Sequence, residues 1–160
     1  MKLDKKDILL LNELQKDCKQ NLKKLSRKLN MSITTVYDRM KKLEKNGVIK
    51  GYKAILDPKK TGNSASAYIF IKTETFTSDS GEPLSQSEIG NKLAKLPEVS
   101  EVYIIPGEFD FLIKIRGKDI DEIANFVIEK LRKMKDINRT FTTDVWVTIK
   151  ECKDLRLRIE

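Results

Sequence analysis

Apolar residues recur at helical spacing in three runs within the first fifty residues of the chain. Asp4 precedes the first run and predicts its N-cap, with Asp7 in the positively polarised first turn. The second run is short and meets a tight turn at Asn30-Met31. Ser32 then predicts the N-cap of a longer helix that ends at Asn46-Gly47. The positions predicted to face inward are Ile8, Leu11 and Leu14 in the first helix, Leu22, Leu25 and Leu29 in the second, and Ile33, Val36, Met40 and Leu43 in the third.

A helix, a short helix, a tight turn and a longer helix form the helix-turn-helix pattern, in which the last helix enters the major groove of DNA. The stretch VIKGYKAILDP follows Gly47. Its β-branched and aromatic residues, its glycine and its final proline predict a short two-stranded wing. The first sixty residues therefore predict a winged helix-turn-helix. The pattern leaves open a basic three-helix interaction domain that does not bind DNA.

The remaining hundred residues alternate between strand and helix patterns. A polar loop at 76–87 precedes a helix capped by Ser87, and Asp119 caps a second helix. The order βαββαβ is the ferredoxin-like unit, an α+β fold with an antiparallel sheet, both helices on one face and the strand order 4-1-3-2. The predicted strands lie at 67–72, 99–105, 111–116 and 139–150.

One face of this sheet is predicted to lack helices. The side chains placed on it are Tyr68, Phe70, Leu112 and Trp146, and such a face is too apolar for open water. We expect it to pack against the sheet of a second copy, so that the chain forms a homodimer. The domains predicted from these patterns are a DNA-binding domain at 1–56, a turn-rich linker at 57–64, the sheet domain at 65–152 and a C-terminal tail at 153–160.

The charge of the chain is unevenly distributed. Residues 1–60 hold 17 Lys and Arg against 7 Asp and Glu, a net charge of +10. Residues 61–160 hold 15 against 17, a net charge of −2. The basic excess therefore lies in the segment with the helix-turn-helix pattern, which indicates a polyanion-binding module joined to a nearly neutral body.

The outward face of the third helix predicts the contacts with double-stranded DNA. Its N-terminal residues reach base edges, so Thr34, Thr35 and Asp38 are candidates for base readout. Tyr37 either joins them or packs against the second helix, and Asp38 either accepts from a cytosine amino group or orients Arg39. Cations suit phosphates. The complete candidate set is Ser32, Thr34, Thr35, Tyr37, Asp38, Arg39, Lys41 and Lys42, with Lys50 and Lys53 on the wing.

Several function classes find no support in these 160 residues. Histidine is absent, no nucleophile–base pair or metal-ligand cluster can be assembled, and Cys18 and Cys152 have no ligand spacing, so we predict no enzyme, no metal and no cofactor. The start of the chain predicts no signal peptide, and no apolar run approaches the ~18 residues of a membrane span, so we expect a cytoplasmic protein. The alternative to a sequence-specific regulator is an architectural protein that wraps DNA with little sequence preference and senses no effector.

The chain resembles the Lrp/AsnC family of leucine-responsive, or feast/famine, transcription regulators. The resemblance rests on LDKKDILLLNELQKD, on MSITTVYDRMKKLEKNGVIKGY and on GEFDFLIKI, and it covers nearly the whole chain. It implies a winged helix-turn-helix followed by a βαββαβ sensor domain. It also implies homodimers that assemble into tetramers or octamers and bind an amino acid or a similar small metabolite between dimers.

The resemblance also implies an effector site. The family's glycine-x-x-aspartate turn corresponds to Gly107, Glu108, Phe109 and Asp110, and its threonine pair to Thr140 and Thr142. Hydroxyls and peptide N–H groups can hold a carboxylate, and Asp110 can hold an ammonium group. The other interpretation is a plain turn, with the threonines packing at a contact between dimers. Three features depart from the family pattern: Pro106, the length of the 76–87 loop, and Lys19-Gln20 in place of an arginine before the second helix.

Overall fold

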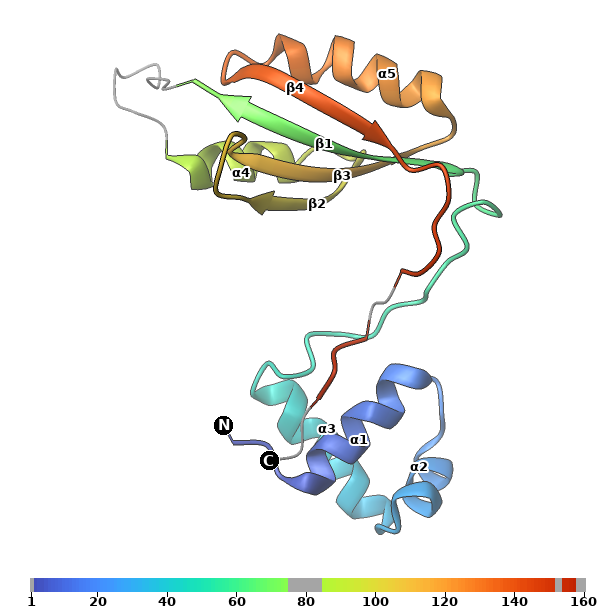
Figure 1. Cartoon of the computed structure of the whole chain (residues 1–160). Helices are drawn as coiled ribbons and strands as arrows, with labels where there is room; N and C mark the ends of the chain where they lie inside the picture. The colour runs from blue at the N-terminus through green and yellow to red at the C-terminus, as the bar shows by residue number, and fades with distance from the viewer. Residues whose placement is uncertain (1, 75–84, 152–153, 158–160) are drawn as a thin grey trace. The chain divides into compact units, whose positions relative to one another are not determined.

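The computed structural model describes residues 2–74, 85–151 and 154–157. Most of the predicted loop at 76–87 lies outside these residues. The chain divides into two compact units (Figure 1). The first unit contains Met1–Ile55 together with Lys150–Glu160, and the second contains Leu56–Ile149.

The first unit contains the three predicted helices, α1 (Lys5–Lys16), α2 (Leu22–Leu29) and α3 (Ile33–Lys45). Asp4 caps α1 and forms a reciprocal capping box with Asp7, while Asn30 adopts the left-handed conformation in the turn before α3. Gly47, with φ +69°, follows the end of α3 as predicted. The buried core residues of this unit are Leu10, Leu11, Leu14, Leu25, Met31, Val36 and Leu43.

Two predictions for this unit are wrong. Ile33 was expected to face inward, but its side chain is 47% exposed. It is the first residue of α3, where the helix extends beyond the packing seam formed by Val36 and Leu43. The two predicted strands of the wing are also missing, because none of the described residues pairs with residues 50–57 as a strand. Ile55 is 70% exposed there.

Residues 154–157 belong to the first unit. The Gln15 side-chain amide donates to the Leu155 carbonyl oxygen at 3.1 Å and accepts from the Leu155 amide at 2.6 Å. Leu157 packs against the helical core. A mostly apolar groove of about 890 Å³ lies between the last turn of α1, residues 48–55 and residues 154–157. The helix-turn-helix unit is therefore built from both ends of the chain.

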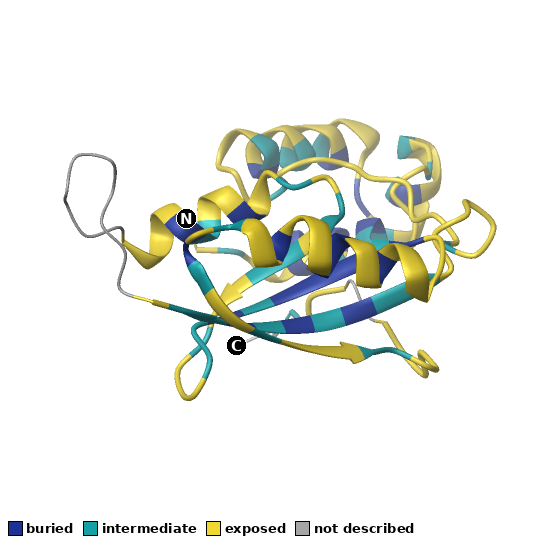
Figure 2. Cartoon of the chain, turned by 90° about the horizontal axis from the view of Figure 1, so that it is seen from above, coloured by how far each residue is buried: buried dark blue, intermediate teal, exposed yellow. Residues whose placement is uncertain are grey.

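The second unit is the predicted four-stranded antiparallel sheet with the order β2-β3-β1-β4. Its helices lie on one face, against the buried side chains of alternate strand residues such as Ile69, Ile71 and Ile113 (Figures 1 and 2). The elements are β1 (Ala65–Thr73), α4 (Gln86–Ala94), β2 (Val99–Ile104), β3 (Phe111–Gly117), α5 (Ile120–Glu129), a short 3₁₀ helix (Leu131–Lys133) and β4 (Ile137–Asp144). The fold class and strand order predicted from the sequence are confirmed.

Two boundaries in this unit differ from the predictions. The N-cap of α4 is Ser85 rather than Ser87, because Ser85 forms a reciprocal capping box with Glu88. β4 ends at Asp144 rather than near residue 150. It is antiparallel to β1 and loses its pairing partner where β1 begins, the Val145 amide making the last bond, to the Ser66 carbonyl.

The early end of β4 changes the open face of the sheet. Trp146 was predicted to lie there but follows the strand and is 92% exposed. Phe141 takes that place, because it pairs in register with Phe70. The rings of Phe70, Phe109 and Phe141 form a cluster with centroid separations of 5.6, 6.1 and 6.5 Å. The face without helices is therefore aromatic, although one predicted member was misplaced.

Candidate DNA interface and effector site

The start of α3 separates residues that hold the helix from residues that face solvent. The Ser32 hydroxyl accepts from the Thr35 amide at 3.0 Å and lies 2.8 Å from the Thr35 hydroxyl. These two side chains therefore form the cap. Thr34, Tyr37 and Asp38 are exposed, and in the described part of the chain no side-chain hydrogen bond or ion pair engages Thr34 or Asp38.

Arg39 is directed into the helix-turn-helix unit. Its guanidinium lies 2.7 Å from the Asp4 carboxylate and 2.6 Å from that of Asp7, whose side chain is only 3% exposed. The hydrogen bond from Arg39 holds the pKa of Asp4 below its usual value, and the two carboxylates raise the pKa of Arg39. This arrangement fixes α3 against the first turn of α1. It does not involve Asp38, which one interpretation of the sequence paired with Arg39.

The predicted phosphate-binding lysines lie at the surface. Lys41 pairs with Glu44 at 3.2 Å and lies 5.8 Å from the centroid of the Tyr37 ring. Lys42, Lys50 and Lys53 are exposed, and none has a side-chain partner among the described residues. Exposed ammonium groups on flexible stems suit non-specific phosphate contacts.

The wing segment is attached to α3 by Tyr52. The Tyr52 hydroxyl donates to the Glu44 carboxylate at 3.0 Å. Burial and this carboxylate raise the pKa of Tyr52 to about 12, while the same bond contributes to a lowered pKa of Glu44. The contact holds the segment between Lys50 and Lys53 beside the C-terminal half of α3.

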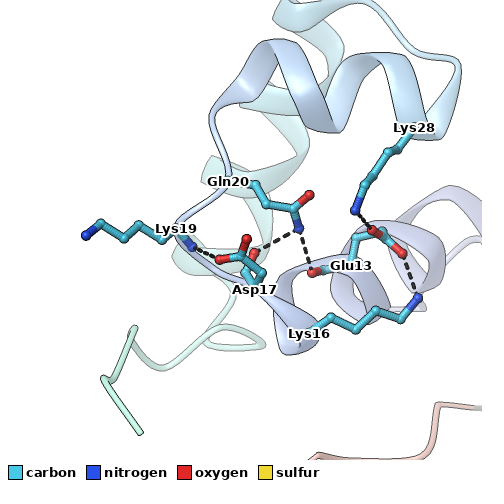
Figure 3. A network of polar contacts seen from close by, with 6 residues as sticks. All are labelled: Glu13, Lys16, Asp17, Lys19, Gln20 and Lys28. Carbon is cyan, nitrogen blue, oxygen red and sulfur yellow. Dashed lines mark hydrogen bonds and ion pairs between the residues drawn. The ribbon is translucent and has the colours of Figure 1, made fainter.

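A polar network joins α1 to α2 at the Lys19-Gln20 position (Figure 3). The Gln20 amide donates to the carbonyl oxygens of Glu13 and Asp17, which closes the end of α1. The Glu13 carboxylate lies 2.7 Å from the ammonium groups of both Lys16 and Lys28, and these bonds lower its pKa to about 2. Gln20 is therefore structural, whereas the amine of Lys19 points away from the network (Figure 3).

The second candidate site is the turn between β2 and β3. Gly107 has φ +119°, a conformation that other residues rarely adopt. The Ile105 amide donates to the Asp110 carbonyl oxygen, and the Asp110 amide donates to that of Ile71, both at 2.9 Å. The turn is therefore fixed to the end of β1. Asp110 is thereby placed beside Lys72 and Thr73.

Both carboxylates of the turn already have partners. Asp110 accepts from the Thr73 amide at 2.8 Å, from the Thr73 hydroxyl at 3.0 Å and from the Lys72 ammonium at 3.2 Å. Burial raises the pKa of Asp110, but these bonds outweigh it and hold that pKa below its usual value. Glu108 pairs with Arg139, whose guanidinium also lies 5.1 Å from the centroid of the Phe109 ring.

The threonines lie across the sheet from this turn. Ile71 pairs with Phe111 on one side and with Thr140 on the other, so Thr140 and the start of β3 are level with each other. Two strand spacings separate them, a distance of about 10 Å, which a small molecule can span. Thr140 and Thr142 share the helix-covered side with Ile71 and Ile69, while Phe109 packs on the open face.

Three residues of this region were not identified from the sequence: Lys72, Thr73 and Arg139. In the sequence, Lys72 and Thr73 fit the end of the first predicted strand, and Arg139 fits the beginning of the last one. Their contacts with the turn depend on the pairing of β1 with two strands distant in sequence. In the described residues there is no group of three or more His, Cys, Asp or Glu side chains that could hold a metal ion.

Comparison with known proteins identifies the family. Residues 66–155, more than half of the chain, match the model of the Lrp/AsnC ligand binding domain. The chain belongs to the Lrp/AsnC family. Residues 3–50 match the model of a winged helix-turn-helix DNA-binding domain. The chain is therefore an HTH-type transcriptional regulator of the Lrp/AsnC family and not an enzyme.

Individual relatives cover almost the whole chain. An uncharacterised HTH-type transcriptional regulator of Pyrococcus furiosus is 40% identical over 149 residues, which are 93% of this chain and 96% of that protein. The HTH-type transcriptional regulator FL11 of Pyrococcus horikoshii is 34% identical over 156 residues, which are 98% and 97% of the two chains. A transcriptional regulator of Neisseria meningitidis, solved as a complex with L-Met, is 25% identical with a TM-score of 0.87 and 97% of both chains covered.

The comparisons confirm the Lrp/AsnC resemblance and the order of the two domains.

Among the described residues, no helix has the length and apolar character needed to cross a membrane.

Proposed function

We propose that this protein binds particular sequences of double-stranded DNA as a homodimer or a larger assembly, and that an amino acid or a related small metabolite modulates this binding. The observation that carries the proposal is the exposed face at the start of α3. Thr34 and Asp38 have no intramolecular side-chain partner in the described structure, and Lys42 lies one turn further along. A DNA-binding domain with free hydrogen-bonding groups at the N-terminus of its reading helix is suited to base recognition.

Each DNA contact has a stated role in this proposal. Thr34, Asp38 and Tyr37 meet base edges, and Lys41, Lys42, Lys50 and Lys53 meet phosphates. Ser32, Thr35 and Arg39 fix α3 in position. The aromatic face containing Phe70 and Phe141, the latter 57% exposed, supports pairing with the sheet of a second copy. Such a dimer presents two α3 helices to major grooves about 34 Å apart. Its place of action would be the cytoplasm, where the chain meets DNA.

The effector part of the proposal rests on the turn at Gly107–Asp110. The Asp110 carboxylate holds the Lys72 ammonium at 3.2 Å, so a ligand ammonium can replace a group of the same charge. Arg139 beside Glu108 offers a cation for a ligand carboxylate once that pair opens. Tetramers or octamers would place this turn between dimers, as the family resemblance implies. L-methionine is the first amino acid to test, because the Neisseria relative was solved as a complex with it.

DNA specificity is tested by binding to a sequence selected from random duplexes, measured against scrambled competitors over a range of salt. We expect strong preference for the selected sequence and a steep fall of affinity with salt. Equal affinity for unrelated duplexes would instead identify an architectural DNA-binding protein.

The effector is tested by thermal unfolding with and without each amino acid. A ligand at about 100 times its dissociation constant adds about 2.7 kcal/mol to the free energy of unfolding if it binds only the folded chain. We expect Asp110→Asn and Thr140→Val to abolish the shift. The matched control is Asp136→Asn, because Asp136 also pairs with a lysine, Lys92, at 2.7 Å. A shift that survives Asp110→Asn would contradict the proposed site.

A further inference from the structure

The reading end of α3 carries two exposed apolar side chains. Ile33 is 47% exposed and Tyr37 is 48% exposed. They are four residues apart in one helix, so they lie on the same face, one turn apart. Ile33 is the first residue of the helix, where side chains approach base edges most directly in a helix-turn-helix.

Three polar side chains near Ile33, those of Ser32, Thr35 and Arg39, are engaged in contacts within the helix-turn-helix unit. The Ser32 hydroxyl accepts from the Thr35 amide and is hydrogen-bonded to the Thr35 hydroxyl, and Arg39 is paired with Asp4 and Asp7. Among the first seven residues of α3, the side chains at the surface are Ile33, Thr34, Tyr37 and Asp38. Two of these four side chains, Ile33 and Tyr37, are largely apolar. A helix that bound phosphates alone would not require an exposed isoleucine at its first position.

The major groove of DNA has one prominent apolar feature, the C5-methyl group of thymine. We propose that Ile33, flanked by the ring of Tyr37, contacts a thymine methyl group and so selects a thymine at a fixed position of the DNA site. This inference rests on the proposed sequence-specific DNA binding and adds to it the base and the atom that Ile33 recognises.

The test uses the full chain and the DNA site selected for it. Each thymine of that site is replaced in turn by deoxyuridine, which removes only the methyl group. We expect one substitution in each half-site to weaken binding by about fourfold, the effect of exposing about one buried methyl group. Ile33→Ser should bind the thymine site with similarly reduced affinity and should no longer distinguish thymine from uracil there.

A matched control separates this contact from general affinity. Lys42→Ala should weaken binding to all DNA, while it keeps the preference for thymine over uracil. If no deoxyuridine substitution weakens binding to a selected site, the inference is overturned while the proposed function stands. If no sequence is selected at all, the proposed function itself fails.

The other place for Ile33 is a contact between copies of this chain. In that case Ile33→Ser would change the assembly size in light scattering and would leave the discrimination between thymine and uracil intact. That outcome would also overturn the inference.

Discussion

The two units use their charged residues in different ways. On the proposed DNA-facing side of the helix-turn-helix unit, Lys42 and Asp38 have no side-chain partner among the described residues, whereas the partly buried Arg39 is paired with two carboxylates of the same unit. In the sheet unit, both carboxylates of the candidate effector turn are already engaged by residues of the same chain. The proposed base-reading residues are therefore free of side-chain partners in the described chain, whereas an effector at the proposed turn would have to displace internal partners.

The units also differ in how the chain builds them. The sheet unit is one continuous stretch, Leu56–Ile149. The helix-turn-helix unit also includes residues 154–157, and Gln15 forms two hydrogen bonds with Leu155. The DNA-binding unit is therefore joined to the sheet unit at two points of the sequence, near residues 55 and 150. In the first unit, α3 carries both exposed residues proposed to contact DNA and residues that stabilise the unit. Single substitutions can therefore test the two roles separately.

The largest effect is expected from Arg39→Ala. It removes a charged donor from the buried Asp7 carboxylate, so the free energy of unfolding of the first unit should fall by about 2 kcal/mol. Urea unfolding measures this change. Lys42→Ala is the matched control on the same helix: it should change stability by less than about 0.5 kcal/mol.

In DNA titrations, Lys42→Ala should reduce the slope of log affinity against log salt by about 0.9 per protomer, or about 1.8 for the proposed homodimer. If Arg39→Ala left stability unchanged and reduced the salt slope in the same way, Arg39 would be a phosphate contact. The distinction between inward and outward charges on α3 would then be wrong.

A smaller effect is expected from Gln15→Ala, which removes both hydrogen bonds to Leu155. We expect the free energy of unfolding of the first unit to fall by about 1 kcal/mol, because each exposed hydrogen bond contributes modestly. Gln15→Glu keeps an acceptor for the Leu155 amide, so it should lower the free energy of unfolding by about half as much as Gln15→Ala. Calorimetry that resolves the two units checks this, and an unchanged transition for Gln15→Ala would show that the C-terminal segment does not stabilise the first unit.

The smallest effect concerns acid. The folded pKa of Glu13 is about 2, below the 4.5 of an unperturbed glutamate. As the pH falls, Glu13 is therefore protonated in the unfolded state before it is protonated in the folded state. The contribution of Glu13 is complete above about pH 4.5 and is lost as the pH approaches 2.

Glu13→Gln should accordingly flatten the fall of the melting temperature between pH 4.5 and 2. High salt should reduce the difference from wild type, because surface charges are screened. An identical pH dependence in the two proteins would show that the bonds to Lys16 and Lys28 do not persist in solution.

Local chemistry determined much of this protein from its sequence alone. The caps Asp4, Ser32 and Asp119 and the left-handed Gly47 set helix boundaries through bonds to residues nearby in the chain. The alternation of apolar residues decided which faces of β1 and β3 are buried, and crossover handedness led to the correct strand order. The concentration of basic residues identified the nucleic-acid-binding half.

Tertiary structure decided what local patterns do not encode. Ile33 fits an inward-facing helical spacing, yet it lies outward because it precedes the packing seam. Arg39 is one cation among many in the sequence, and only the approach of α1 gives it two carboxylates. Trp146 lies beyond the sheet because β4 passes the start of β1 and has no further residues of β1 to pair with. Asp110 meets Lys72 and Thr73, and Gln15 meets Leu155, across more than thirty residues of intervening chain. These contacts depend on long-range packing, which spacing along the sequence does not specify.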